Sequence, residues 1–290
     1  MMPFKNRKVK VAALSVFSNT ILIILKVIAG ILSGSVSIIS EAIHSGMDLA
    51  AAVIAFFSVR LSSKPADEKH QYGHGKIENI SGVTEGLLIF VAAFLIIKEA
   101  VKKILYPSHI EEAAVAIGVM AVSAVANFIV SRILYKVSRE EDSVALEADA
   151  LHLKTDVYTS VGVGVGLLLI KLTGMVLLDP IVAIMVALLI IKESWELCST
   201  AFSPLLDSRL PEDEVQEIMD IIENYKPEII DFHMLKTRKS GHIRYIDFHM
   251  TVNEELNVKA AHDLSDRIER DLEERIKNIN INIHIEPGRL

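Results

Sequence analysis

Six long apolar stretches constrain the fold of this 290-residue chain more than any other feature. A helix needs about 20 mostly apolar residues to cross a bilayer, and each stretch is at least that long. With 51% hydrophobic and 23% charged residues, the composition is also that of a membrane protein rather than a soluble one. The sequence therefore predicts an α-helical membrane bundle of six transmembrane helices, over residues 9–32, 36–61, 80–101, 113–137, 144–172 and 176–201.

Basic residues in the connections predict how these helices cross the membrane. The amino terminus and residues 62–77 and 132–139 are rich in lysine and arginine. The turns at residues 33–35 and 173–179 contain neither, and Lys102 is a mild exception on that side. The positive-inside rule then places both termini of this multi-pass chain in the cytoplasm. We interpret the first stretch as a retained span because it is longer than the apolar part of a signal peptide.

After Pro204 the sequence changes to that of a soluble domain. Residues 206–290 hold 12 basic and 19 acidic residues, so this tail carries the whole net charge of −7. Nucleic acid is not an expected partner, because binding it requires a basic face. Helical and strand periods alternate in the order αββαβ, which predicts a small α+β domain with its helices on one face of a three-stranded sheet. The expected elements are a helix from Pro211, strands at 229–237 and 242–251, a helix at 258–276 and a strand at 279–285.

Two predicted spans contain the same pair of ionisable residues at the same spacing. His44 and Asp48 lie in one span, and His152 and Asp156 lie in another. Residues at i and i+4 share one face of a helix, so each pair offers a nitrogen and an oxygen to one point. Two such pairs provide the four ligands that a tetrahedral ion such as Zn²⁺ takes. The alternative is two buried ion pairs, but the repeated spacing favours a metal site in the middle of the membrane.

The loop between the second and third spans contains a second group of possible ligands. Asp67, His70 and His74 lie within eight residues of one another. They could bind zinc with water completing the coordination shell. A polar, solvated loop explains them equally well, and the sequence leaves both interpretations open.

The tail contains half of the histidines of the chain. His284 and Glu286 point to one face of their predicted strand because residues at i and i+2 do so, and His233 and His249 lie on the two preceding strands. His262 lies in the predicted helix. This density of histidines in an acidic domain favours a metal site, with His242 on the turn as the expected bystander.

Other polar residues of the spans are expected to have structural roles. Lys26, Lys98 and Lys171 are placed near span ends, where a long side chain reaches the headgroups. Glycines around residue 164 are interpreted as close helix contacts rather than a nucleotide loop. Interfacial or inter-helix roles are favoured for the acidic residues that have no partner at ligand spacing, namely Glu41, Glu85, Glu147 and Asp149.

Together, the two His-x3-Asp pairs, the Asp67-x2-His70-x3-His74-Gly75-Lys76 loop, the six spans and the αββαβ tail resemble the cation diffusion facilitator family. The resemblance implies a homodimer in the cell inner membrane that exports a divalent metal in exchange for protons. It also implies that the tail is similar to ferredoxin-like metallochaperone domains and binds regulatory metal through His233, His249, His262, His284 and Glu286. Lys76 and Asp207 match a salt bridge of the family near the membrane surface.

Two positions depart from the family pattern. Some bacterial relatives have Asp at the position of His44, and a second imidazole favours zinc, or cobalt or nickel, over manganese. Glu286 stands where relatives have Asp.

The sequence thus predicts a membrane domain at residues 1–205, a cytoplasmic regulatory and dimerisation domain at 206–290, and proton-coupled export of Zn²⁺. Zinc is the cargo and regulatory ligand, and no catalytic cofactor is expected. An enzyme is not expected, because no His-Glu-x-x-His motif, nucleotide loop or nucleophile arrangement is found. The alternatives are a membrane-anchored metal sensor, or the same transporter with cobalt, nickel, iron or manganese as its main substrate.

Overall fold

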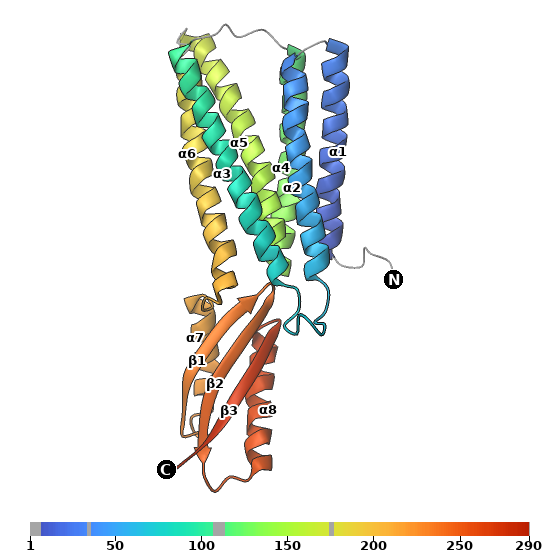
Figure 1. The fold of residues 1–290 in the computed structure, drawn as a ribbon. Helices are drawn as coiled ribbons and strands as arrows, with labels where there is room; N and C mark the ends of the chain where they lie inside the picture. The colour runs from blue at the N-terminus through green and yellow to red at the C-terminus, as the bar shows by residue number, and fades with distance from the viewer. Residues whose placement is uncertain (1–6, 34–35, 107–113, 174–176, 290) are drawn as a thin grey trace.

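The computed structural model describes residues 7–33, 36–106, 114–173 and 177–289, and six long helices form its first part (Figure 1). Some side chains within these helices, that of His44 among them, lie outside the described residues. The helices lie side by side in an elongated bundle: α1 (Arg7–Ser33), α2 (Val36–Ser62), α3 (Lys76–Leu105), α4 (Ala114–Glu141), α5 (Val144–Thr173) and α6 (Leu178–Phe202).

Three segments of the described residues are both long and apolar enough to cross a membrane. They are Arg7–Ile28, Lys76–Lys102 and Ala121–Glu141, which lie in α1, α3 and α4. The expectation of six such spans therefore holds for three helices by this measure. The other three helices carry ionisable residues along their length, and parts of α2 and α5 lie outside the described side chains.

The helices bury many small side chains beside aliphatic ones, and they expose many large apolar side chains. Ala12, Ala52 and Ala93 are fully buried between helices, whereas Phe17 and Phe94 are more than 60% exposed. Without water to drive apolar groups together, membrane helices associate through close contacts of small residues and leave large apolar ones to the lipid. The surface of the bundle is therefore suited to a bilayer.

The tail, in contrast, is built around a core of large apolar side chains. Its sheet has the order β1 (Asp231–Ser240), β2 (Ile243–Asn253), β3 (Ile279–Gly288), with β1 antiparallel and β3 parallel to the central β2. Helices α7 (Glu212–Glu223) and α8 (Val258–Arg275) cover one face of the sheet (Figure 1). The core between them is built from large apolar side chains such as Ile218, Phe248 and Ile268, each at most 1% exposed. The predicted αββαβ order is confirmed, and the strands extend a few residues beyond their predicted ends.

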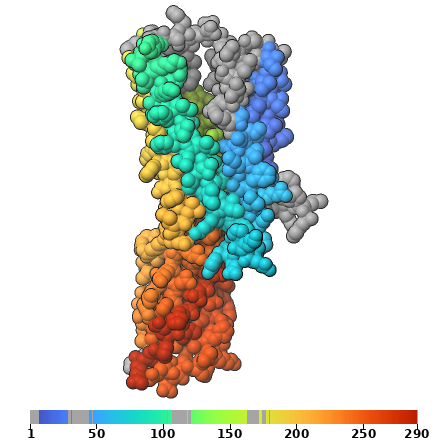
Figure 2. All heavy atoms as spheres, in the orientation of Figure 1, coloured from blue at the N-terminus to red at the C-terminus, as the bar shows by residue number. Residues whose placement is uncertain are grey.

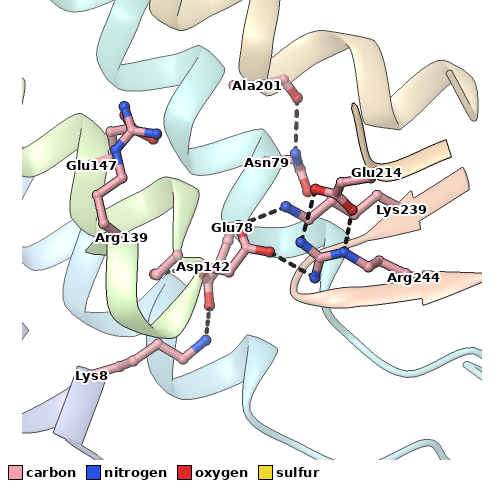
Figure 3. A network of polar contacts seen from close by, with 11 residues as sticks. Lys8, Glu78, Asn79, Arg139, Asp142, Glu147, Ala201, Glu214, Lys239 and Arg244 are labelled. Carbon is pink, nitrogen blue, oxygen red and sulfur yellow. Dashed lines mark hydrogen bonds and ion pairs between the residues drawn. The ribbon is translucent and has the colours of Figure 1, made fainter. Parts of the chain in front are cut away.

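A network of ion pairs joins the tail to the helices (Figure 3). Asp142, in the turn between α4 and α5, lies 2.6 Å from the ammonium of Lys239 on β1 and 3.2 Å from the guanidinium of Arg244 on β2. Arg244 also pairs with Glu214 of α7. The turn that leads into α5 is therefore held directly against the sheet.

A buried carboxylate ties together the ends of several helices that lie nearest the tail. Glu78, in the first turn of α3, is paired with Lys8 of α1 at 3.1 Å and accepts hydrogen bonds from the hydroxyls of Ser62 and Ser143. Beside it, the β1–β2 turn touches the start of α3, where a Cβ atom added to Gly75 would lie only 2.5 Å from the carbonyl oxygen of Ser240. The loop between α2 and α3 emerges at this junction (Figure 2).

Candidate metal centres

The interior of the helix bundle contains a compact cluster of potential ligands. Asp48 of α2 and His152 and Asp156 of α5 each offer one ligand atom, and these atoms lie within 4.8 Å of one another. The Nε2 atom of His152 lies 3.2 Å from a carboxylate oxygen of Asp48. The two side chains are only 12% and 7% exposed. The i, i+4 spacing on α5 thus presents both of its ligands to α2, as the helical period requires.

His44 is the fourth predicted ligand of this cluster. Its side chain lies outside the described residues, whereas its position in α2 is one turn from Asp48. The structure therefore brings together three of the four residues, and His44 stays a prediction.

A neighbouring helix holds one of the ligands in place. The side-chain amide of Asn127 on α4 donates a hydrogen bond of 3.2 Å to Asp156. Partners of this kind orient metal ligands and are often as important as the ligands themselves. The sequence alone could not connect Asn127 with this cluster, because no spacing rule links α4 to α5.

Lys26 corrects an expectation about the spans. It was placed near a span end with its ammonium at the headgroups, but it is 4% exposed and donates a hydrogen bond of 2.6 Å to the hydroxyl of Ser45. Ser45 precedes Asp48 by one turn of α2. A positive charge therefore lies inside the bundle near the cluster, which only the packing of α1 on α2 could reveal.

The loop ligands also come together, but in a solvated setting. The carboxylate oxygens of Asp67 lie 3.2 Å from the ring of His70 and 3.3 Å from that of His74. The backbone N–H of His70 donates to Asp67, and this bond is the main cause that lowers the pKa of the carboxyl group. Asp67 and His70 are exposed, so water could complete the coordination of an ion here.

Aromatic side chains hold this loop against the tail. The guanidinium of Arg238 on β1 lies against the rings of both Tyr72 and Tyr245, 4.8 Å and 4.5 Å from their centroids, and the two rings contact each other edge to face. Arg238 also pairs with Asp207, as does Lys76 at 2.8 Å. Lys76, the largest cause, and Arg238 lower the pKa of Asp207. The Lys76–Asp207 pair expected from the family resemblance is formed.

The tail cluster lies on one row across the sheet. His233 pairs in register with His249, and His249 with His284. Ligand atoms of His233, His249 and Glu286 lie within 4.8 Å of one another, with 2.8 Å between His249 Nδ1 and Glu286. The hydrogen bond from His249 is the largest cause that lowers the pKa of Glu286. All three side chains are partly exposed, so an ion could reach them from solution.

Two further tail histidines, His284 and His262, differ in their proximity to this cluster. The ring of His284 lies 4.7 Å from that of His249, at the edge of the cluster. His262, which the family resemblance added to the set, lies on the exposed side of α8 beside Asp266 at 3.5 Å. The structure therefore does not bring His262 to the other ligands.

His242 lies on the turn where the sequence placed it, but that turn contacts the helices, which the sequence did not indicate. It lies at the β1–β2 turn in the junction, within electrostatic reach of Lys8, Glu78, Asp142 and Lys239. Burial is the main cause that lowers its pKa, and Lys8 adds to the effect. The expected bystander is thus part of the contact between tail and membrane helices.

In comparisons with known proteins, each half of the chain matches a domain family. Residues 12–206 match the model of the cation efflux transmembrane domain, and residues 210–288 match that of the cation efflux protein cytoplasmic domain. An uncharacterized transporter of Synechocystis is 37% identical over 91% of this chain and 85% of its own length. The cation-efflux pump FieF of Yersinia pestis is 32% identical over 99% of this chain and 95% of its own.

Among solved structures, the zinc form of CzrB, a proposed zinc transporter, is 34% identical and aligns with a TM-score of 0.27. The alignment covers 28% of this chain and 93% of that one.

Proposed function

The chain belongs to the cation efflux, or cation diffusion facilitator, family of transporters, and we propose that it exports Zn²⁺ from the cytoplasm in exchange for protons. The single observation that supports this most strongly is the buried cluster of Asp48, His152 and Asp156. Two carboxylates in a bundle interior are unfavourable unless a cation or protons compensate them. A transported dication is such a compensation.

The ligand types favour zinc as the cargo. An imidazole and two carboxylates, with His44 as the proposed fourth ligand, form the mixed nitrogen and oxygen set that tetrahedral zinc accepts. Cobalt, nickel and iron are alternative substrates for such a set, whereas manganese prefers a site richer in oxygen.

Competition between metal and protons gives a mechanism for exchange. Only neutral imidazole and ionised carboxylate bind a metal, so protonation of His152, Asp48 and Asp156 displaces the ion. Metal would bind from the cytoplasm with release of protons, and protons from the more acidic side would then evict it. The helices that carry the ligands would move between two conformations, one that opens the site to the cytoplasm and one that opens it to the opposite side of the membrane.

We further propose that all six long helices cross the cell inner membrane and that both termini are cytoplasmic. The exposed apolar surface of the bundle and the soluble core of the tail support this arrangement. The match of the tail to the family's cytoplasmic domain supports a homodimer, and the clusters at Asp67 and His249 are proposed regulatory sites.

Uptake of zinc by inside-out vesicles tests the proposal. With a pH gradient across the membrane, we expect zinc to accumulate in vesicles that contain the unaltered chain and not in those with Asp48→Ala or Asp156→Ala. Glu99→Ala is the matched control, because this acidic residue is exposed at the end of α3 and pairs only loosely with Lys102 at 3.7 Å. Unchanged uptake in both cluster variants would refute the site, whereas no uptake by the unaltered chain would favour a membrane-anchored sensor.

A further inference from the structure

A second pair of acidic residues, which belongs to none of the three proposed metal sites, is buried between the helices. Glu85 of α3 and Asp149 of α5 are both 0% exposed. They lie close enough for their charges to repel each other, and His152 is close enough to attract both. The sequence favoured interfacial or inter-helix roles for these residues, and their complete burial excludes the interfacial one.

The protein provides few hydrogen-bond partners for these carboxyl groups. Ser81 donates a hydrogen bond of 3.2 Å to one oxygen of Glu85. Within the described part of the chain, the other oxygen of Glu85 and both oxygens of Asp149 have no hydrogen-bond partner. A buried carboxylate without partners is strongly unfavourable, so each group must bind a proton or another cation to remain buried.

A neutral polar group of α1 lies beside the pair. The hydroxyl of Ser15 is close enough to Asp149 to act on it, although neither side chain has a hydrogen-bond partner of regular geometry among the described residues. The charged groups known to act on the pair are its own two members and His152. No described lysine or arginine is among these groups.

The donors favour protons over a metal ion. The groups of three or more potential ligands found among the described residues do not include Glu85 or Asp149. Two carboxyl groups alone are a poor site for a tetrahedral dication but can share protons, because two neighbouring carboxylates cannot both stay ionised when buried.

The position of the pair suits a proton site coupled to the metal. Asp149 precedes His152 by three residues, about 4.5 Å along the helix axis, and lies nearer the end of α5 that contacts the tail. A dication bound at His152 would repel protons from the pair across this short distance. Loss of the ion would allow the protons to return.

We propose that Glu85 and Asp149 form a proton-binding carboxyl pair on the cytoplasmic side of the Asp48–His152–Asp156 cluster, which releases a proton when metal binds and regains it when metal leaves. This inference rests on the proposed transport function and adds a second place at which protons are exchanged.

Counting the protons released on zinc binding tests the inference. The full chain is used in a background with Asp67→Ala and His249→Ala, which removes the exposed clusters. Zinc is added in weak buffer with a pH indicator, and binding is measured in parallel. We expect Glu85→Gln/Asp149→Asn to release about one proton fewer per ion than the background, while still binding zinc. Glu99→Gln, at an exposed site, should release the same number as the background.

The outcomes separate two failures. If Asp156→Ala abolishes zinc binding in this background but the double variant releases the full number of protons, the carboxyl pair is refuted and the transport site stands. If Asp156→Ala leaves zinc binding unchanged, the proposed function itself fails, and the pair's role fails with it.

Infrared difference spectra provide a readout that does not depend on both substitutions being tolerated. In the background chain, zinc binding should remove absorption by protonated carboxylic acid, and either Glu85→Gln or Asp149→Asn alone should reduce this change. A difference spectrum that neither variant alters would overturn the inference.

Discussion

The membrane helices and the tail differ in the kinds of side chain that they bury and expose. The tail buries Phe248, Met250 and Ile268 around one core, whereas the helices bury many alanine, serine and ionisable side chains beside aliphatic ones and expose phenylalanine and leucine. The hydrophobic effect drives large apolar side chains into the core of the tail, whereas the helices in lipid experience no such driving force. The interior of the bundle is therefore free to hold polar chemistry, and the surface of the tail is where its chemistry must lie.

The ligand clusters of the two regions differ in the same way, in whether they are enclosed or exposed. Asp48, His152 and Asp156 are enclosed by helices, whereas His233, His249 and Glu286 lie on the open face of the sheet. The donors are of the same kind, so their surroundings distinguish the proposed roles. An enclosed site must open to exchange its ion, which suits transport, and an exposed one can equilibrate with the surrounding solution, which suits regulation.

The largest expected effect comes from truncating a core residue of the tail. Phe248→Ala should lower the free energy of unfolding of the tail by about 3–5 kcal/mol, because it leaves a cavity in a packed core. Phe94→Ala, at a lipid-facing position of α3, should change the stability of the helices little. Thermal unfolding of the purified chain measures both. Equal losses at the two positions would contradict the contrast between the two halves.

Zinc should stabilise the tail by a somewhat smaller amount. A ligand bound only by the folded state adds about 2.7 kcal/mol at one hundred times its dissociation constant. His249→Ala and Glu286→Gln should abolish the shift in melting temperature, and His262→Ala should not, because that side chain lies apart beside Asp266. A shift that depends on His262 would favour the ligand set implied by the family resemblance over the geometry seen here.

Loss of the hydrogen bond to Asp156 should weaken metal binding in the enclosed cluster. Asn127→Leu removes this bond, and we expect the affinity for zinc to fall about 10- to 100-fold. Ser131→Ala is the matched control, since its hydroxyl donates to the carbonyl of Ala150 across the same α4–α5 contact without touching a ligand. Equal affinities in the two variants, measured by calorimetry, would show that Asn127 does not orient the site.

The smallest expected effect is a pH dependence at the junction. Burial lowers the pKa of His242 below its usual 6.5, so the docked state favours the neutral ring. At a pH above this usual pKa the ring is neutral in both the docked and the undocked state, so pH does not affect the contact. As the pH falls through that value, the undocked state gains a proton first and docking weakens. His242→Asn should flatten this dependence in hydrogen exchange of the β1–β2 turn, whereas His262→Asn should leave it unchanged; the same slope in both would refute it.

Local periodicity accounts for what could be predicted from sequence. The i, i+4 spacing of His152 and Asp156 and the strand alternation of His284 and Glu286 follow from backbone geometry alone, and the structure places these residues accordingly. A register shift between His233 and Lys236, with Met234 at a φ of 54°, lies in a strand whose alternation alone did not reveal it.

Contacts between distant segments account for what sequence could not provide. Asn127 meets Asp156, and Lys26 meets Ser45, only because particular helices pack together. Likewise, Glu85 and Asp149 come from helices far apart in the chain, so their pairing has no signature in spacing.

Direct location of zinc in the full-length chain is the most direct test of the central claim. Anomalous scattering at the zinc edge, from crystals soaked in zinc, should show a peak bound by Asp48, His152 and Asp156 within the helices. Peaks confined to the loop and tail clusters, with the enclosed one empty at saturating zinc, would contradict the account.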